Sequence, residues 1–166
     1  NHDINAFGGV PYGSMQDALP TYIALSVVTE GMPLLYAGLE TSAPGKTDPI
    51  VGCSRAAREE TVRETYRRFF ALKHANKALW NAPWGGRLEL VENTDQDHVF
   101  AFTRQVAGNR VFAVFNLSRK STDVTFKGSK HWGKYTSVQN GQGVEIGALT
   151  TLNLGPWGWQ VYTANQ

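Results

Sequence analysis

The chain has 166 residues, of which 42% are hydrophobic and 18% are charged. This length allows one domain with a hydrophobic core, or a small domain with an appended segment, and the composition is typical of folded rather than disordered proteins. The formal net charge of +2 offers little attraction to nucleic acid or an anionic membrane, and no apolar stretch approaches the roughly 20 residues that span a bilayer. We therefore expect neither a nucleic-acid nor a membrane partner.

The single cysteine, Cys53, excludes an intrachain disulfide and leaves the redox compartment open. No histidine or second cysteine lies near it at ligand spacing, so we interpret it as a structural or surface thiol rather than a nucleophile. The chain begins at Asn1, without a methionine, a basic leader or an apolar leader. We interpret this start as that of a processed or partial product.

The first predicted elements lie within residues 14–38. Ser14 can cap a helix that runs to about Thr29, but Pro20 would cost about 3 kcal/mol in a helix interior. We therefore expect the helix to begin late or to kink there. The following run, MPLLYAG at 32–38, is short, apolar and bounded by Pro33 and Gly38, which predicts a strand buried on both faces.

Residues 39–52 are rich in Thr, Ser, Pro, Gly and Asp, which predicts a loop. Ser54 then caps a long predicted helix that ends near His74. We expect ion pairs at a spacing of four residues, Glu59 with Arg63 and Glu64 with Arg68. The apolar residues expected on its buried side are Ala57, Val62, Tyr66, Phe69, Phe70 and Leu72.

The periodicity changes after Trp80, so we place a domain boundary within residues 81–86 and predict domains at 1–82 and 83–166. Short alternating, β-branched and aromatic runs separated by turn residues predict an antiparallel β-sandwich in the second domain. The expected strands are 87–92, 99–104, 110–117, 122–126, 134–138, 144–149 and 159–162. In VAGNRV, Gly108 and Asn109 tolerate positive φ and predict a hairpin turn.

The five tryptophans have two predicted environments. Trp157 and Trp159 flank a glycine near the last strand, so we expect one to point inward and the other outward. Trp80, Trp84 and Trp132 lie beside predicted turns. For these three we favour packing in a core or domain interface, with stacking of an exposed indole on a sugar ring as the alternative.

Several segments, in order, resemble the α-amylase family of retaining glycoside hydrolases. NHD at 1–3 resembles the last active-site motif, at the end of the seventh barrel strand, and GMPLLYAGLE at 31–40 resembles the eighth strand. FFALKHANKALWN resembles the eighth helix and its exit, while VFAFTR, VFAVFNLS and PWGWQVY resemble strands of the following sandwich. The chain departs from the family pattern at Leu39, where an acidic residue usually precedes the glutamate.

The resemblance implies an α+β fold: an incomplete (β/α) barrel remnant with two helices and one buried strand, followed by an antiparallel β-sandwich. A complete barrel of this type needs about 250 residues. The family's nucleophile and general acid lie on strands that this sequence does not contain. A missing barrel segment or a homo-oligomer is therefore an expected partner, and the family implies a secreted or periplasmic protein.

The resemblance also assigns the candidate site residues. Asp3 corresponds to the third active-site carboxylate, which binds sugar hydroxyls and distorts the ring, and His2 to a neighbouring hydroxyl donor. Tyr36 and Glu40 are expected on the same rim as substrate-binding residues. Hydrogen bonds of this kind stabilise the oxocarbenium-like transition state more than the ground state.

Other interpretations of these residues remain. Asn-His-Asp by itself is also typical of an ordered polar turn. A zinc site at His2 and Asp3 would need a further ligand, and His74, His98 and His131 fall on different predicted elements. No cofactor is evident, although calcium is common in the intact family.

Three functions follow from these features. The first is a glycoside hydrolase fragment acting on α-1,4-glucan or maltooligosaccharide. The second is a non-catalytic α-glucan-binding module, in which exposed aromatic side chains hold the sugar. The third is an oligomerising structural fragment, because an unclosed barrel leaves apolar surface that needs a partner.

Overall fold

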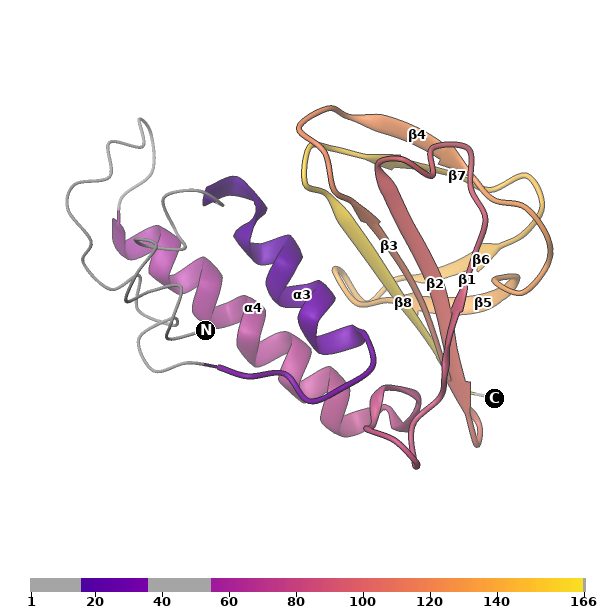
Figure 1. The fold of residues 1–166 in the computed structure, drawn as a ribbon, viewed down its shortest axis with the longest axis horizontal. Helices are drawn as coiled ribbons and strands as arrows, with labels where there is room; N and C mark the ends of the chain where they lie inside the picture. Colours follow the sequence, from indigo (N-terminus) through magenta and orange to yellow (C-terminus); the bar gives the residue numbers. More distant parts are fainter. Residues whose placement is uncertain (1–15, 36–54, 166) are drawn as a thin grey trace.

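A computed structural model describes residues 16–35 and 55–165. Two helices lie beside an antiparallel β structure (Figure 1). This arrangement confirms the predicted α+β class. His2, Asp3, Tyr36, Glu40 and Cys53 lie outside the described residues.

The first helix begins later than its apolar pattern suggests. A 3-10 turn, η1 (Gln16–Ala18), precedes α3 (Leu19–Val28), and Pro20 falls within the first helical turn. There its missing N–H removes no intrahelical hydrogen bond, which is why proline is tolerated at this place. The helix was expected either to begin late or to kink at Pro20, and in the structure it begins late.

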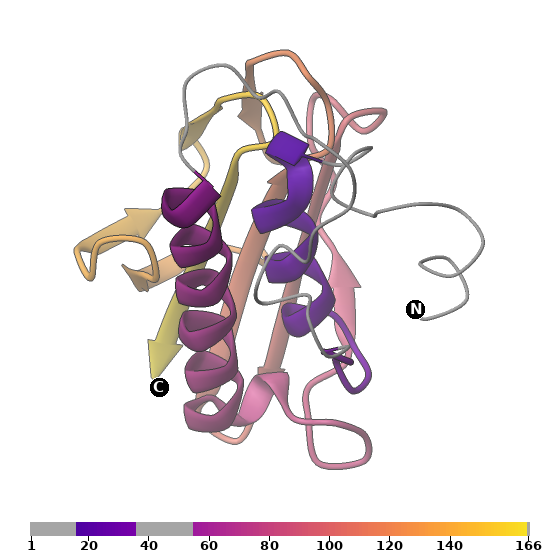
Figure 2. The same ribbon diagram turned by 90° about the vertical axis from the view of Figure 1, so that its left-hand side faces the viewer.

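The second helix, α4 (Arg55–Ala75), runs parallel to α3, and the two lie side by side across one face of the large sheet (Figure 2). Val62 and Phe69 are buried on the expected side. The predicted pairing of Glu64 with Arg68 is wrong, because Glu64 contacts Arg67 at a spacing of three. Arg63 pairs with Glu60 at 3.5 Å. The Glu59 side chain lies outside the described residues, so the pairing of Glu59 with Arg63 stays a prediction.

Residues 32–35 contradict the prediction of a buried strand, as far as this segment is described. They form no strand, and Met32 and Leu34 are 83% and 76% exposed. A strand becomes buried on both faces only when neighbouring strands and helices cover it. The described part of the chain supplies no such neighbours for this segment.

The β region forms two sheets. The large sheet has six strands in the order β1-β2-β3-β8-β5-β6, and the small sheet pairs β4 with β7. All described pairs are antiparallel. The strands are β1 (Leu88–Leu90), β2 (Val99–Val106), β3 (Asn109–Asn116), β4 (Thr122–Thr125), β5 (Gly133–Ser137), β6 (Gly143–Ile146), β7 (Thr151–Leu154) and β8 (Trp159–Asn165).

Strand β7 was missed by the sequence prediction, which extended the preceding strand to Leu149. That leucine is 96% exposed, in the turn before β7. In β7 itself Leu152 and Leu154 are buried, while Thr151 and Asn153 are exposed. The alternation is clear but covers only four residues, which is why the run was easily missed.

The predicted hairpin between β2 and β3 is present, but its turn lies one residue earlier. Val106 pairs with Asn109, so the turn residues are Ala107 and Gly108, with φ of 42° and 80°. Two consecutive positive φ values are typical of a type I′ turn, whose twist matches that of the flanking strands. Ala107 therefore holds a conformation that suits asparagine or glycine better.

The large sheet separates two hydrophobic clusters because alternate residues of its strands face opposite sides. Phe112 and Val114 of β3 face the small sheet, with Leu152 and Leu154 of β7 among the residues that they join. Val111, Ala113 and Phe115 face the helices, where they join a cluster that contains Val27, Val28 and Phe69. Strand β3 is thus buried on both faces because it lies in a middle layer.

The segment between helices and sheets, residues 76–87, is held close to both. A short 3-10 helix, η3 (Lys77–Leu79), is capped by Asn76, whose side chain accepts a hydrogen bond from the Ala78 N–H. At Gly86 a Cβ atom would approach the Gln105 backbone to 2.6 Å, so only glycine fits there. The chain passes this point in direct contact with β2, and the division into domains at 82 stays a prediction.

Candidate functional site

The predicted active-site residues His2, Asp3, Tyr36 and Glu40 fall outside the described residues, so their mutual arrangement stays a prediction. The structure does describe residues 31–35, which lead directly to Tyr36. The direction in which the chain leaves α3 is therefore the part of the predicted site that can be built from observed contacts.

Arg104 fixes the end of α3. Arg104 belongs to β2, and its side chain lies between the sheet and the helices, where it is only 1% exposed. One guanidinium nitrogen, Nη1, donates to the carbonyl oxygens of Val28 and Thr29 at 3.0 and 2.9 Å. These are carbonyls of the last helical turn, which have no partner within the helix and carry the negative end of its dipole.

The same guanidinium also holds the segment between helices and sheets. Its Nε donates to the Gly86 carbonyl at 2.8 Å, and Nη2 donates to the Trp80 carbonyl at 2.9 Å. Burial lowers the pKa of Arg104, and the Glu30 carboxylate opposes that effect. One side chain on β2 thus joins α3, the connecting segment and the large sheet.

Lys73 and Glu30 complete this joint. The Lys73 ammonium donates to Leu79 and Gly31 carbonyls at 2.6 and 3.1 Å, and burial followed by repulsion from Arg104 lowers its pKa. The Glu30 carboxylate accepts a hydrogen bond from the Leu88 N–H, at the start of β1. Two cations at the end of α3 suit the helix dipole, and together these contacts set the position from which residues 31–35 depart.

Sequence reasoning missed this joint, although a signal was present. In the run VFAFTR, Phe100 and Phe102 alternate onto the helix-facing side of β2, and Arg104 continues the same alternation. A charged residue at a position where the pattern predicts a core side chain indicates a buried polar contact.

A groove of about 500 Å³ lies between α4 and β8. Its wall consists of polar residues of α4, and Trp159 at the start of β8 lies opposite. The residues that line it are Glu60, Thr61, Glu64, Thr65, Arg68 and Trp159. A groove of this size with an aromatic side and several polar groups has the general form of a small-ligand site.

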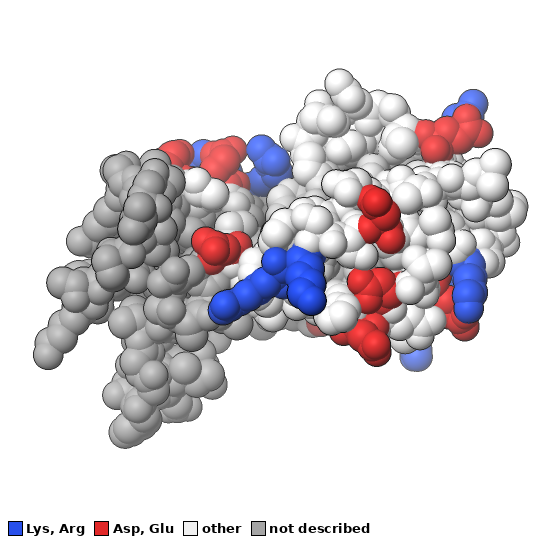
Figure 3. Space-filling model, turned by 90° about the horizontal axis from the view of Figure 1, so that it is seen from above, with Lys and Arg blue, Asp and Glu red and all other residues white. Residues whose placement is uncertain are grey.

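The described part of the surface carries acidic and basic side chains intermixed, without a broad patch of one sign in the view from above (Figure 3). Among the described residues, no helix is both long enough and apolar enough to cross a membrane. The same residues contain no cluster of three or more His, Cys, Asp or Glu side chains that could hold a metal ion. His74, His98 and His131 lie on separate segments, as expected from the sequence.

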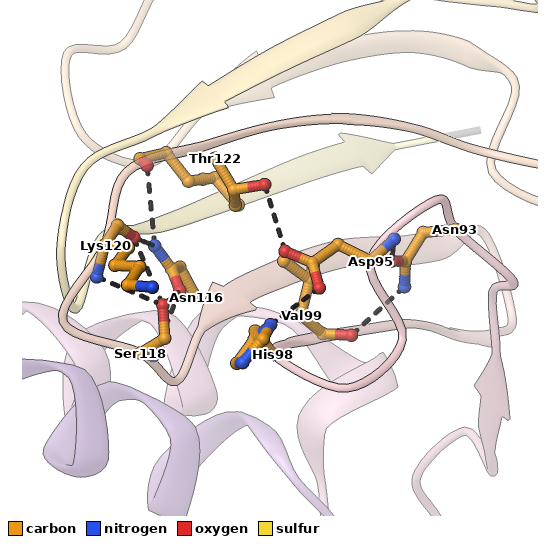
Figure 4. A network of polar contacts seen from close by, with 9 residues as sticks. Asn93, Asp95, His98, Val99, Asn116, Ser118, Lys120 and Thr122 are labelled. Carbon is orange, nitrogen blue, oxygen red and sulfur yellow. Dashed lines mark hydrogen bonds and ion pairs between the residues drawn. The ribbon is translucent and has the colours of Figure 1, made fainter.

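The polar network in Figure 4 is structural rather than a candidate site. Asp95 contacts His98 Nδ1 at 2.8 Å and accepts a hydrogen bond from the Thr122 hydroxyl at 3.0 Å. The hydrogen bond with His98, aided by Thr122 and opposed by burial, lowers the pKa of Asp95. Asn116 donates from Nδ2 to the carbonyls of Lys120 and Gly155. The network therefore ties the loops at one end of the sandwich.

The tryptophans differ from the predictions. Trp80, Trp84 and Trp132 are 39%, 69% and 43% exposed, so the favoured packing in a core or interface is wrong for them. Trp157 and Trp159 do not point to opposite sides. Trp157 lies near Tyr22 of α3 and Trp159 near Phe69 of α4, with ring centroids 6.1 and 4.9 Å apart respectively. Trp157 precedes β8 in a turn with φ of 52°, so strand alternation does not apply to it.

A comparison with protein families gives a match for the β region of the chain. Residues 91–163, less than half of the chain, match the family model described as alpha amylase, C-terminal all-beta domain. No curated protein sequence matches the chain significantly.

Similar solved structures include a noncanonic maltogenic α-amylase, AmyB, from Thermotoga neapolitana, with a TM-score of 0.69 at 16% identity. Another is AmyP in complex with maltose, with a TM-score of 0.71 at 13% identity. A third is the γ-CGTase from alkalophilic Bacillus clarkii, with a TM-score of 0.66 at 18% identity. The matches cover 91%, 94% and 89% of this chain but only 37%, 36% and 23% of those chains. The chain thus shares their fold over about a third of their length or less.

Proposed function

We propose that the chain is part of a glycoside hydrolase that cleaves α-1,4-linked glucan by the retaining mechanism, because residues 91–163 match the family model of the alpha-amylase C-terminal all-beta domain. The supporting observation is that the match extends beyond this domain: α3, α4 and the sandwich together superpose on amylase structures over 91% of this chain. The helices therefore belong to the same arrangement as the sandwich.

In this proposal, residues 1–40 supply one side of the active site. Asp3 and His2 bind hydroxyls of the sugar ring at the cleavage point, and Tyr36 and Glu40 line the rim. A retaining hydrolase also needs a nucleophilic carboxylate and an acid about 5 Å apart. These come from barrel strands outside the present sequence, so the 166 residues alone are expected to release no sugar.

Exposed apolar side chains support this view. Met32, Leu34 and Leu35 follow α3 without cover from the described residues. An apolar segment of this kind is stabilised when strands and helices of a barrel pack on both of its sides. The joint of Arg104, Lys73 and Glu30 would hold the end of α3 at a fixed distance from the sandwich while the barrel packs there.

The proposal is tested by measuring reducing-sugar release from maltoheptaose with the longest polypeptide that the gene encodes. We expect Asp3→Asn to lower kcat about 10²- to 10³-fold, the usual effect of removing one group that stabilises developing charge. Asp17→Asn, an exposed acid in η1, is the matched control and should leave kcat unchanged. Full activity of the Asp3→Asn protein would remove Asp3 from the mechanism.

A non-catalytic glucan-binding module is the second candidate, and the exposed indoles of Trp80, Trp84 and Trp132 favour it. Retention of the protein on starch, with no sugar release by any encoded form of the chain, would support this function over hydrolysis.

An oligomerising fragment is the third candidate, favoured by the exposed segment at residues 32–35. A concentration-dependent increase in mass by sedimentation, in protein that has no affinity for glucan, would support it.

A further inference from the structure

The groove between α4 and β8 combines a rigid aromatic surface with hydrogen-bonding groups. Its α4 residues recur at one face of the helix, because positions 60, 61, 64, 65 and 68 follow helical spacing. Trp159 lies opposite and is half-buried. Its ring meets the ring of the buried Phe69 in an edge contact, at 4.9 Å and 68°, so the indole is supported from the protein interior.

The polar groups of the groove include both donors and acceptors. Glu60 and Glu64 are acceptors, and each is about half-exposed and paired with an arginine outside the groove lining. Arg68 is exposed and has no partner among the described residues. Its guanidinium can therefore donate to a ligand without breaking an existing contact.

These features select one class of ligand. Two carboxylates disfavour phosphate and other anions, while Arg68 disfavours a cation, and the charged wall disfavours a purely apolar molecule. A pyranose ring has an apolar C–H face that stacks on an indole, and its hydroxyls donate to carboxylates and accept from arginine. A neutral oligosaccharide satisfies each group in the groove.

We propose that this groove binds a segment of α-glucan, with one glucose ring on Trp159 and its hydroxyls held by Glu64 and Arg68. The choice of an α-linked glucan rests on the proposed function, whereas the geometry by itself points to a neutral sugar. The groove is formed by residues other than the four that the resemblance assigns to the active site.

The test is calorimetric titration of the 166-residue chain with maltoheptaose, with cellopentaose as the β-linked comparison. Trp159→Phe keeps an aromatic ring against Phe69 but removes most of the stacking surface, and should weaken maltoheptaose binding about tenfold. Arg68→Met should weaken it about two- to tenfold, the effect of one lost hydrogen bond. Circular dichroism and the thermal midpoint establish that each variant folds.

Matched controls are Trp157→Phe, which changes a half-buried indole beside Tyr22 of α3, and Arg119→Met, which changes an exposed arginine. Neither residue lines the groove, so both variants should leave the affinity unchanged. The proposal is overturned if the chain binds no maltoheptaose at millimolar concentration, or if Trp157→Phe weakens binding as much as Trp159→Phe does. Equal affinity for cellopentaose would refute the choice of an α-glucan. If the longer polypeptide hydrolyses no glucan, the proposed function is refuted, whereas the proposal that the groove binds a sugar is not.

Discussion

Replacing Arg104 tests whether the helices and the sandwich form one cooperative structure. Arg104→Met retains most of the side-chain length but removes the guanidinium that serves four carbonyl groups: those of Val28, Thr29, Trp80 and Gly86. Two of these hydrogen bonds, to Val28 and Gly86, are fully buried. Water can reach the other two carbonyls more easily, so most of the effect comes from the buried pair.

Each buried acceptor left without a partner costs about 1–3 kcal/mol. For two such carbonyls, the free energy of unfolding should fall by about 2–6 kcal/mol, a large fraction of the about 5–15 kcal/mol that stabilises a typical domain. Part of the loss is offset because methionine avoids the desolvation of a buried charge. We therefore expect the loss of unfolding free energy to lie in the lower half of the estimate for two carbonyls, at about 2–4 kcal/mol.

The measurement is urea unfolding, followed by both circular dichroism at the helix band and tryptophan fluorescence. Arg119→Met, an exposed arginine in the loop between β3 and β4, controls for removal of a guanidinium. A loss below about 1 kcal/mol would refute the reasoning, since it would mean that all four carbonyls regain equivalent partners. If helix signal were lost at lower urea than fluorescence in the variant only, Arg104 would be shown to couple the two parts.

Two further predictions concern single residues of the sandwich. His131 is fully buried, and neither of its ring nitrogens has a hydrogen-bond partner among the described residues; burial, aided by Arg110, lowers its pKa from 6.5. Because the unfolded chain then binds a proton that the folded protein does not, stability should fall as the pH drops below 6.5, by up to about 1.4 kcal/mol per pH unit until the folded pKa is passed. His131→Leu should remove this part of the pH dependence in urea unfolding at pH 7 and pH 5, and an unchanged slope would contradict it. Ala107→Asn should raise the unfolding free energy by about 0.5–1 kcal/mol, because asparagine tolerates the positive φ of this turn better than alanine. A lower thermal midpoint than that of the wild type would refute this, and Ala164→Asn, near the end of β8, is the control in which no gain is expected.

Local chemistry along the chain was enough to predict much of this fold. Pro20 limits where α3 can begin, since its ring is compatible only with the first turn. The alternation in β2 and β3, and the glycine between them, predict a hairpin from neighbouring residues alone. Antiparallel pairing of β1 with β2, of β2 with β3 and of β5 with β6 follows from the short connections between these strands. These features depend on residues close together in the sequence, which is why they can be inferred without a structure.

Other features depend on what lies on each side of a segment. The run at 32–35 has the composition of a doubly buried strand, but Met32 and Leu34 are exposed because the described residues provide no layer to cover them. The large indole side chains of Trp80, Trp84 and Trp132 favour burial, but all three are exposed. Composition reports an affinity for apolar surroundings, whereas burial requires that those surroundings be present.

The sequence by itself determined the helices, most of the strands and the resemblance that assigns roles to His2, Asp3, Tyr36 and Glu40. Only the tertiary structure decided that Arg104 of β2 holds the end of α3, and that Trp159 faces a wall of polar side chains from α4. Arg104 lies more than 70 positions from Val28, and Trp159 lies more than 90 positions from the α4 residues that it faces. Their meeting follows from the packing of helices onto the sheet, a property of the whole fold that no local pattern contains.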